Sequence, residues 1–259
     1  MNWFYANDGT LPIISAKNHV SSSHGNCNVE KLPDTCVIFE MGMAISHIES
    51  TYKTKILIEK LPCFLENPKC IVIDGYDNVC FTHGGYGAPA AVDTLETIRV
   101  LGVKKVIGIG MCGVFSNQVD VGDVIIPHKI LSEEGTSHHY FANHMFSEPN
   151  KQLFENAVEF FKDKFNTFTK ATVTSDAVYR QTFFKEALWR EKNCVGVDME
   201  SSALLAVSKY YDMPAVSILL ASDKHPISDK DVDWSWGSND FQMIRKKFVD
   251  KCVAFSLEQ

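Results

Sequence analysis

The sequence predicts an α/β fold: a single domain with a central mixed β-sheet flanked by helices. Short apolar runs alternate along the chain with longer segments in which apolar residues recur at helical spacing. This alternation is typical of a parallel or mixed sheet covered by helices on both faces. The 259 residues, 45% of them hydrophobic, suffice for one large core. We expect residues 1–259 to form one domain, in which residues 1–33 are an irregular N-terminal excursion.

The apolar runs and the periodic segments give the expected elements in chain order. Strands are predicted at Cys36–Phe39, Lys55–Ile58, Cys70–Ile73, Val79–Thr82, Val106–Ile109, Val124–Pro127, Ala171–Thr174, Val195–Val197 and Ala215–Ala221. Helices are predicted at Ala88–Leu101, Lys151–Phe165, Phe183–Glu191, Glu200–Tyr211 and Asp240–Phe255.

Composition and charge exclude several classes of protein. The formal net charge is −7 and no cluster of Lys or Arg occurs, so we expect no nucleic-acid partner. No apolar stretch reaches the length of a membrane span, and residues 1–10 lack the pattern of a signal peptide, so we expect a cytoplasmic protein without a membrane partner. The 8 cysteines lack metal-type spacing and fit buried free thiols of a reducing compartment, with disulfides as the alternative.

Ligands of such sheets bind at the carboxyl ends of strands, where three motifs carry unusual residues. In the first, the strand Val106–Ile109 runs into Gly110-Met111-Cys112-Gly113. Glycines allow backbone amides to approach an anion or a sugar closely. The alternative is a tight turn without a ligand. The spacing is not that of a dinucleotide-binding loop.

In the second motif, Gly196-Val197-Asp198-Met199-Glu200-Ser201, two carboxylates flank a methionine where a strand becomes a helix. A carboxylate there can accept hydrogen bonds from neighbouring sugar hydroxyls, and Met199 offers an apolar face to a ribose. Two acids in the first turn of a helix are also favoured by the helix dipole alone, which is the alternative.

In the third motif, Ala221-Ser222-Asp223-Lys224-His225-Pro226, an apolar strand delivers Asp223 to the edge of the site. We expect partial burial to raise the pKa of Asp223 and to suit it to donating a proton. An aspartate that caps a turn after a strand is the alternative.

Together these motifs resemble the nucleoside phosphorylase superfamily, which includes purine nucleoside phosphorylases, uridine phosphorylases and several nucleosidases. The resemblance covers most of the chain, from about Leu11 to the last helix. Three further segments match in the same order: residues 83–89 (HGGYGAP), 134–140 (EGTSHHY) and 174–180 (TSDAVYR). The resemblance implies a nucleoside phosphorylase-like sheet that is partly barrel-like, and an enzyme that cleaves the bond between ribose and a nucleobase.

The resemblance also implies roles for individual residues. Glu200 matches the glutamate that binds the ribose hydroxyls, Met199 the methionine that packs on the sugar, and Asp198 an acid of the sugar and base site. Asp223 matches the aspartate that protonates a leaving purine, so Asp223 and Glu200 are the catalytic candidates. The other substrate-binding candidates are Val178 and Tyr179 beside the base, Arg180, Gly110, Met111, Thr136, Ser222 and Gly42. For Tyr179, a buried core tyrosine is the alternative to stacking on the base.

The sequence departs from the phosphorylases at the phosphate site. Ser46, Gly108 and Ser132 stand where relatives carry arginines, so the bidentate clamp for phosphate is missing. We expect phosphorolysis to a free base and ribose 1-phosphate, with inorganic phosphate as co-substrate and no cofactor. Hydrolysis is the alternative, with water activated by Glu40 or Glu134.

Two lower alternatives remain. One is a nucleoside-binding protein without activity. The other is a zinc enzyme that uses His138, His139 and His144, although their spacing does not define a metal site and we expect none. The expected partners are a small nucleoside and phosphate, and because members of the family it resembles assemble as oligomers, we expect a homo-oligomer. His19 or His24 is a candidate group donated to a neighbouring subunit, with an ordinary surface histidine as the alternative.

Overall fold

The computed structural model describes residues 10–22, 31–231, 234 and 239–259. Its strands are β1 (Thr35–Phe39), β2 (Thr54–Ile58), β3 (Cys70–Ile73), β4 (Val79–His83), β5 (Lys105–Val114), β6 (Val124–Ile125), β7 (Ile130–Glu133), β8 (Phe146–Ser147), β9 (Thr167–Phe168), β10 (Ala171–Ser175), β11 (Cys194–Asp198) and β12 (Ala215–Lys224). Its helices are α1 (Ala16–Val20), α2 (Ala44–Thr51), α3 (Ala88–Val100), α4 (Lys151–Phe161), α5 (Phe183–Glu191), α6 (Ser201–Tyr210) and α7 (Asn239–Leu257), with short 3₁₀ turns η1 (Thr136–His139) and η2 (Val178–Arg180).

The strands form one mixed sheet, as the alternating pattern predicts. The order along its main path is β2-β3-β4-β1-β5-β11-β10-β7-β8, and β12 branches from β5 to pair with β6. β1, β4, β5 and β12 run parallel, whereas β11 runs antiparallel to β5. Among the described strands the sheet is not closed into a barrel. The carboxyl ends of β1, β5 and β12 therefore point to one edge of the sheet, and the reversed β11 reaches the same region.

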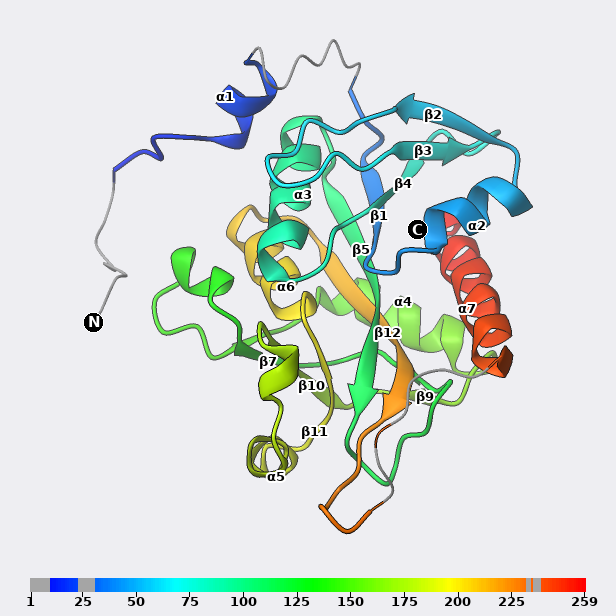
Figure 1. Ribbon diagram of the computed structural model, residues 1–259. Helices are drawn as coiled ribbons and strands as arrows, with labels where there is room; N and C mark the ends of the chain where they lie inside the picture. The colour runs from blue at the N-terminus through cyan, green and yellow to red at the C-terminus, as the bar shows by residue number, and fades with distance from the viewer. Residues whose placement is uncertain (1–9, 23–30, 232–233, 235–238) are drawn as a thin grey trace.

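Alternate residues of the central strands pack against two different helical layers. Val37 and Phe39 of β1 belong to a cluster that includes residues of α2, α4 and α7, while Cys36 and Ile38 belong to a cluster with α3 and α6. This division follows from the period of two along a strand. Figure 1 shows α3 and α6 on one side of the sheet and α2 and α7 on the other. β1 is buried on both faces, which explains why its sequence is a continuous apolar run.

Local sequence fixes where several helices begin. The Asn150 side chain accepts a hydrogen bond from the Leu153 N–H at the start of α4, and Thr182 does the same for the Lys185 N–H at the start of α5. Before α3, Gly87 has φ 86°, a conformation that glycine adopts at little cost. The start of α5 places Phe183 and Glu186 at the site described below.

Several elements of the fold differ from the sequence prediction. β5 continues through Gly110-Met111-Cys112-Gly113, which we expected to be a glycine-rich turn, because it stays paired with β12 as far as Val114. α4 ends at Phe161 instead of Phe165. α1 lies within the N-terminal segment that we expected to be irregular, and the pattern did not predict α2 or β7.

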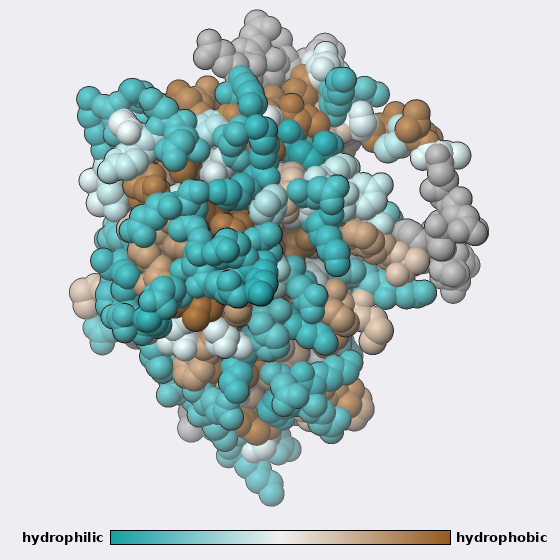
Figure 2. All heavy atoms as spheres, turned by 180° about the vertical axis from the view of Figure 1, so that it is seen from behind, coloured by the Kyte–Doolittle hydropathy of each residue, from teal (hydrophilic) through white to brown (hydrophobic). Residues whose placement is uncertain are grey.

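The surface carries hydrophobic residues in separate patches between hydrophilic ones on the face opposite to that of Figure 1, as Figure 2 shows. No helix in the described part of the chain combines the length and the apolar character needed to cross a membrane. The seven cysteines within the described ranges are all buried free thiols, as predicted from their spacing, and Cys27 lies outside those ranges.

Candidate active site

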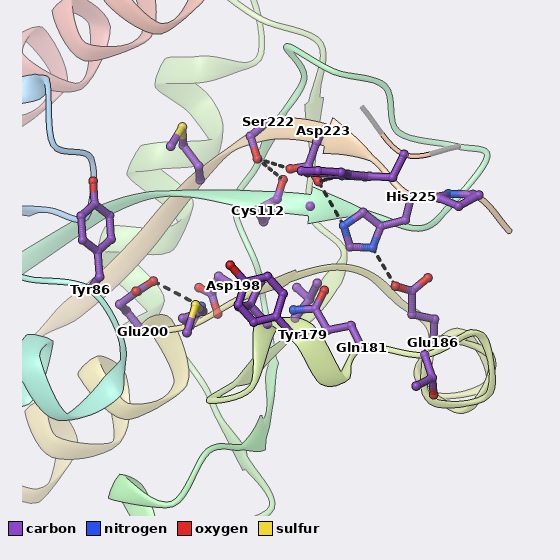
Figure 3. A pocket seen from close by; sticks show the side chains of 18 of the residues that line it. Tyr86, Cys112, Tyr179, Gln181, Glu186, Asp198, Glu200, Ser222, Asp223 and His225 are labelled. Atoms are coloured by element: carbon purple, nitrogen blue, oxygen red, sulfur yellow. Dashed lines mark hydrogen bonds and ion pairs between the residues drawn. The ribbon is translucent and has the colours of Figure 1, made fainter. Parts of the chain in front are cut away.

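A cavity of about 650 Å³ opens where the ends of β5, β11 and β12 meet. Figure 3 shows that its side chains come from segments far apart in the sequence. The lining residues are Glu40, Tyr86, Met111, Cys112, Gly113, Val178, Tyr179, Gln181, Thr182, Phe183, Glu186, Val197, Asp198, Met199, Glu200, Ser222, Asp223, His225, Pro226 and Trp234. All three sequence motifs therefore contribute to one cavity.

At one end of the cavity, Glu200 stands at the N-terminus of α6 but does not cap it. Its side chain makes no capping hydrogen bond to α6. Oε1 instead accepts a hydrogen bond from the Gly87 N–H at 2.6 Å, and Oε2 accepts one from the Met199 N–H at 3.2 Å. The side chain is thus aimed away from the helix and held beside the cavity, where its remaining lone pairs can accept hydrogen bonds from a ligand.

Both carboxylate oxygens of Asp198, by contrast, accept hydrogen bonds from other residues of the protein. Its Oδ1 accepts a 2.5 Å hydrogen bond from the Thr174 hydroxyl, and its Oδ2 accepts one of 3.2 Å from the Ser201 N–H. Burial raises the pKa of Asp198. Burial also raises the pKa of Glu200, and the nearby charge of Asp198 raises it further. Both groups lie close enough to repel each other when ionised, so a positively charged ligand would stabilise the pair.

Glu40, the residue after β1, is the least satisfied carboxyl group of the cavity. It is 6% exposed, and neither oxygen has a hydrogen-bond partner among the described residues. Burial raises its pKa well above the usual range, and the charges of Glu200, Asp198 and Glu66 act in the same direction. Gly84 makes room for it, since a β-carbon there would come within 2.2 Å of Glu40 Oε1. A buried acceptor without a donor is suited to hold a water molecule or a ligand.

At the other end, Asp223 is surrounded by donors. Its Oδ1 accepts a 2.5 Å hydrogen bond from the Ser222 hydroxyl, while Oδ2 accepts one of 2.7 Å from Trp234 Nε1 and lies 3.1 Å from His225 Nε2. Burial acts to raise the pKa of Asp223, but the hydrogen bonds from His225, Ser222 and Trp234 outweigh it and lower the pKa below the ordinary value. Our expectation of a raised pKa for Asp223 is therefore wrong, because it considered burial without the donors.

Sequence reasoning assigned no role to His225 and did not consider Glu186, which the structure brings to Asp223. His225 Nδ1 lies 2.7 Å from Glu186 Oε1, so the ring bridges two buried carboxylates, as Figure 3 shows. The signal for His225 was present in the sequence, because it follows β12 directly and residues two apart in extended backbone point to the same face. No local pattern connects Glu186, on the separate helix α5, with this strand.

The rim of the cavity is formed by η2. Tyr179 lines it while 95% exposed, so the alternative of a buried core tyrosine is wrong, and Val178 is half exposed beside it. Met111, Met199 and Ser222, which the sequence predicts to bind substrate, also line the cavity. A flat aromatic side chain at an open rim is available to stack on a planar ligand.

Five predicted site residues are not among those that line the cavity: Gly42, Gly110, Thr136, Arg180 and Glu134. Arg180 is exposed on η2. Glu134 is buried and satisfied, because its two oxygens accept hydrogen bonds from the Ser132 hydroxyl at 2.7 Å and from the Ser137 N–H at 2.9 Å. It therefore has a structural role on the edge of η1.

Tyr86 contacts the loop between β1 and α2 that contains Gly42. The Gly42 N–H donates a 2.9 Å hydrogen bond to the Tyr86 hydroxyl, and a β-carbon at Gly42 would lie 2.8 Å from that oxygen. The amide that could bind an anion at this loop is thereby occupied by a neutral acceptor.

The histidines proposed for zinc do not form a metal site. No group of three or more His, Cys, Asp or Glu side chains in the described ranges could hold a metal ion. His144 Nε2 instead lies 2.8 Å from the Ser147 hydroxyl. Of the two N-terminal histidines considered for donation to another subunit, His19 packs its ring 5.2 Å from that of Phe64, and His24 lies outside the described residues.

Comparison with known proteins connects this chain to one family. The sequence model of the phosphorylase superfamily matches residues 41–255. Among curated relatives, a guanosine phosphorylase of Halorubrum lacusprofundi is 26% identical over 147 residues, which cover 56% of this chain and 60% of the relative. The chain spans about two thirds or less of the length of the first curated relatives it matches.

Solved structures share the fold. The purine nucleoside phosphorylase of Toxoplasma gondii in complex with immucillin-H superposes with a TM-score of 0.74 at 16% identity, covering 96% of this chain and 98% of that one. The 5′-methylthioadenosine/S-adenosyl homocysteine nucleosidase of Campylobacter jejuni does so with a TM-score of 0.67 at 16% identity, covering 87% and 98%.

Proposed function

Because the chain belongs to the phosphorylase superfamily, we propose that it cleaves the N-glycosidic bond of a purine nucleoside. The single observation that carries the proposal is the placement of Glu200 and Asp223 in one cavity, with Met199 between strand β11 and helix α6 beside them. Glycosidic cleavage builds positive charge on the sugar and negative charge on the base. A carboxylate with free lone pairs suits the sugar end, and a hydrogen-bonded group that can pass on a proton suits the base end.

For the nucleophile, the geometry favours water. Five carboxyl groups line the cavity, those of Glu40, Glu186, Asp198, Glu200 and Asp223, and no lysine or arginine is among its described lining residues. His225 is the one basic side chain among the described lining residues, and it is already paired with Glu186 and Asp223. The ionised carboxylates therefore stabilise an oxocarbenium-like sugar and oppose a phosphate dianion. They equally oppose a 5′-phosphate on the substrate, so we propose a nucleoside and not a nucleotide.

Glu40 is the group proposed to activate that water. Its carboxyl group is buried, lacks a donor among the described residues and has a pKa raised by burial, so its ionised form is a stronger base than an exposed carboxylate. The water oxygen bonds to C1′ of the ribose, the C1′–N9 bond breaks, and the water proton passes to Glu40. The base leaves with a proton from the Asp223 side of the cavity.

Phosphorolysis is the second candidate, and it is favoured by the names of the relatives, one of which is a guanosine phosphorylase. It needs an anion site that the cavity lining does not offer. The Gly42 amide becomes available if Tyr86, whose side chain is exposed, moves away from it. Phosphate would then bond to C1′ and give ribose 1-phosphate.

The test is product analysis with guanosine, inosine, adenosine, uridine and AMP, each with and without phosphate. We expect free purine and free ribose without phosphate, and no reaction of AMP. Glu40→Gln should abolish this release, whereas Glu134→Gln, at the buried carboxyl group outside the cavity, should retain it if the variant folds. Ribose 1-phosphate formed only with phosphate would replace hydrolysis by phosphorolysis. Binding of a nucleoside that stays intact would make the chain a binding protein.

A further inference from the structure

His225 lies between two buried carboxylates. Its Nδ1 is 2.7 Å from Glu186 Oε1, and its Nε2 is 3.1 Å from Asp223 Oδ2. An ionised carboxylate can only accept hydrogen bonds, and a neutral imidazole has only one N–H to donate. Both contacts are satisfied together only when the ring carries two protons, so the geometry selects the imidazolium form.

The surrounding backbone holds the ring in this orientation. The His225 N–H donates a 2.8 Å hydrogen bond to the Val114 carbonyl at the end of β5. Gly113 leaves the space that the ring fills, since a β-carbon there would lie 2.3 Å from His225 Nε2. The ring of Phe115 packs beside it, with centroids 6.5 Å apart. These contacts fix the position of the His225 ring in the wall of the cavity.

The charged groups around His225 come from two elements. Glu186 on α5 and Asp223 on β12 face the ring, and Arg190 on α5 approaches the far oxygen of Glu186, with Nη1 3.9 Å from Oε2. Burial alone lowers the pKa of His225, but the hydrogen bonds and charges of the two carboxylates outweigh it and raise the pKa to about 9. The pKa of Asp223 is lowered by its hydrogen bonds with His225, Ser222 and Trp234. At neutral pH the proton resides on the histidine.

We propose that His225 stores the proton that Asp223 delivers to the leaving purine, so that Glu186, His225 and Asp223 form a proton relay. The inference rests on the proposed glycosidic cleavage. It assigns His225 and Glu186 as residues that act through Asp223, which is the group that contacts the base.

The transfer balances without a further reactant. As the C1′–N9 bond breaks, its electron pair moves onto the purine, whose N7 takes a proton from Asp223. At the same time, Asp223 takes the Nε2 proton of His225. The ring is left neutral, with its Nδ1 proton still donated to Glu186. The proton that Glu40 takes from the attacking water returns through solvent to His225 Nε2 after the base has left.

The decisive experiment compares guanosine with 7-methylguanosine. The base of the methylated nucleoside is already positively charged and leaves as a neutral molecule without a proton. With guanosine, we expect His225→Gln to lower kcat about a hundredfold, the effect of losing a general acid, with little change in KM. With 7-methylguanosine, kcat of the same variant should stay close to that of the unmodified protein. His47→Gln, which alters a histidine paired with Asp250 outside the cavity, is the matched control.

The pH profile gives an independent readout. We expect kcat for guanosine to fall above about pH 9 and Glu186→Gln to move this fall to lower pH, because one of the two carboxylates that hold the proton is lost. Equal loss with both nucleosides in His225→Gln would mean a structural role and overturn the relay, as would an unchanged pH profile in Glu186→Gln. If the unmodified protein releases no base from either nucleoside, the proposed function itself fails and the relay with it.

Discussion

Glu40 and Asp223 are carboxyl groups of the same cavity with opposite surroundings. Glu40 has no donor among the described residues and a raised pKa, whereas Asp223 receives hydrogen bonds from Ser222 and Trp234, contacts His225 and has a lowered pKa. The surroundings of Glu40 therefore favour its protonated form, so that it can take a proton. Those of Asp223 keep it ionised until a proton reaches it. Pairs of titratable groups whose surroundings separate their pKa values are typical of sites that combine base and acid catalysis.

Gly84 makes this arrangement testable without changing a carboxyl group. A β-carbon at Gly84 would lie 2.2 Å from Glu40 Oε1 and 2.5 Å from Ile38 Cγ2. We expect Gly84→Ala to displace Glu40, to abolish base release and to destabilise the fold by about 1–3 kcal/mol through overpacking. Steady-state kinetics and thermal unfolding measure the two effects. Gly135→Ala is the control, since its nearest neighbour would be 3.7 Å away; full activity in Gly84→Ala would remove Glu40 from the mechanism.

Glu200 is expected to act on the ribose through the lone pairs that Gly87 and Met199 leave free. In Glu200→Gln, one oxygen becomes an N–H₂ donor and the charge is lost, so we expect kcat/KM for a ribonucleoside to fall about ten- to a hundredfold. The loss should be smaller for the corresponding 2′- and 3′-deoxynucleosides. Kinetics with this matched set provide the measurement, and an equal loss on all three sugars would contradict a contact with the hydroxyls.

At the scale of elements, the site depends on β5, because the glycines of this strand allow side chains of neighbouring elements to pack closely against it. Gly108 accommodates Leu204 of α6, Gly110 lies against Leu219 of β12, and Gly113 faces His225. β5 is also the strand from which the sheet branches, with β1, β11 and β12 all paired to it. Side chains in place of these glycines would separate the two ends of the cavity that β11 and β12 provide.

Gly113→Ala tests this property of the strand. The new methyl group would meet His225 Nε2 at 2.3 Å and Asp223 Oδ2 at 3.2 Å. Because β5 is held on both sides, the histidine must move, and we expect kcat for guanosine to fall about a hundredfold while 7-methylguanosine is still cleaved. Measuring kcat with guanosine and with 7-methylguanosine tests this expectation. Unchanged cleavage of guanosine would show that the contact between His225 and Asp223 is dispensable.

At the scale of the whole molecule, the cavity makes stability depend on pH. The pKa of His225 is raised from 6.5 to about 9, so its contribution to the free energy of unfolding is complete below pH 6.5 and is lost as pH rises through 9. The contribution is at most about 3 kcal/mol. Burial raises the pKa of Glu40, Asp198 and Glu200 too, which also disfavours the folded state as pH rises. We expect Tm to fall from pH 6.5 to 9, and to fall less steeply in His225→Gln. Parallel slopes in thermal scans would refute the doubly paired imidazolium.

The sequence allowed the fold to be predicted where periodicity and burial agree. β1 and the first part of β12 are predominantly apolar because both faces of each strand are covered, and α3 shows a clear helical period. The extent of β5 was missed because four residues with two glycines are typical of a turn in isolation. Only pairing with β12 keeps them extended, and pairing between residues about 110 positions apart leaves no local signal.

The candidate site was predictable where its residues follow strands directly. Asp198, Glu200 and Asp223 lie at strand ends and line the cavity together. Glu134 and Arg180 come from equally suggestive segments but point elsewhere, because η1 and η2 turn the chain within a few residues. The direction of the pKa shift of Asp223 required knowledge of donors from three positions, and burial alone gave the wrong sign. The homo-oligomer stays a prediction.

The cavity has a floor made by buried strands and a rim made by the exposed turn η2. This difference has a consequence for how the substrate preference of the protein evolves. The floor, with Asp198 and Ser222, belongs to strands whose amides open only when the central sheet opens, so its geometry is maintained by the stability of the entire domain. Tyr179 and Val178 stand on an exposed turn whose replacement disturbs no core. Mutations there can alter which bases are admitted without changing the bond that is broken. We therefore expect new substrate preferences to arise in η2 first.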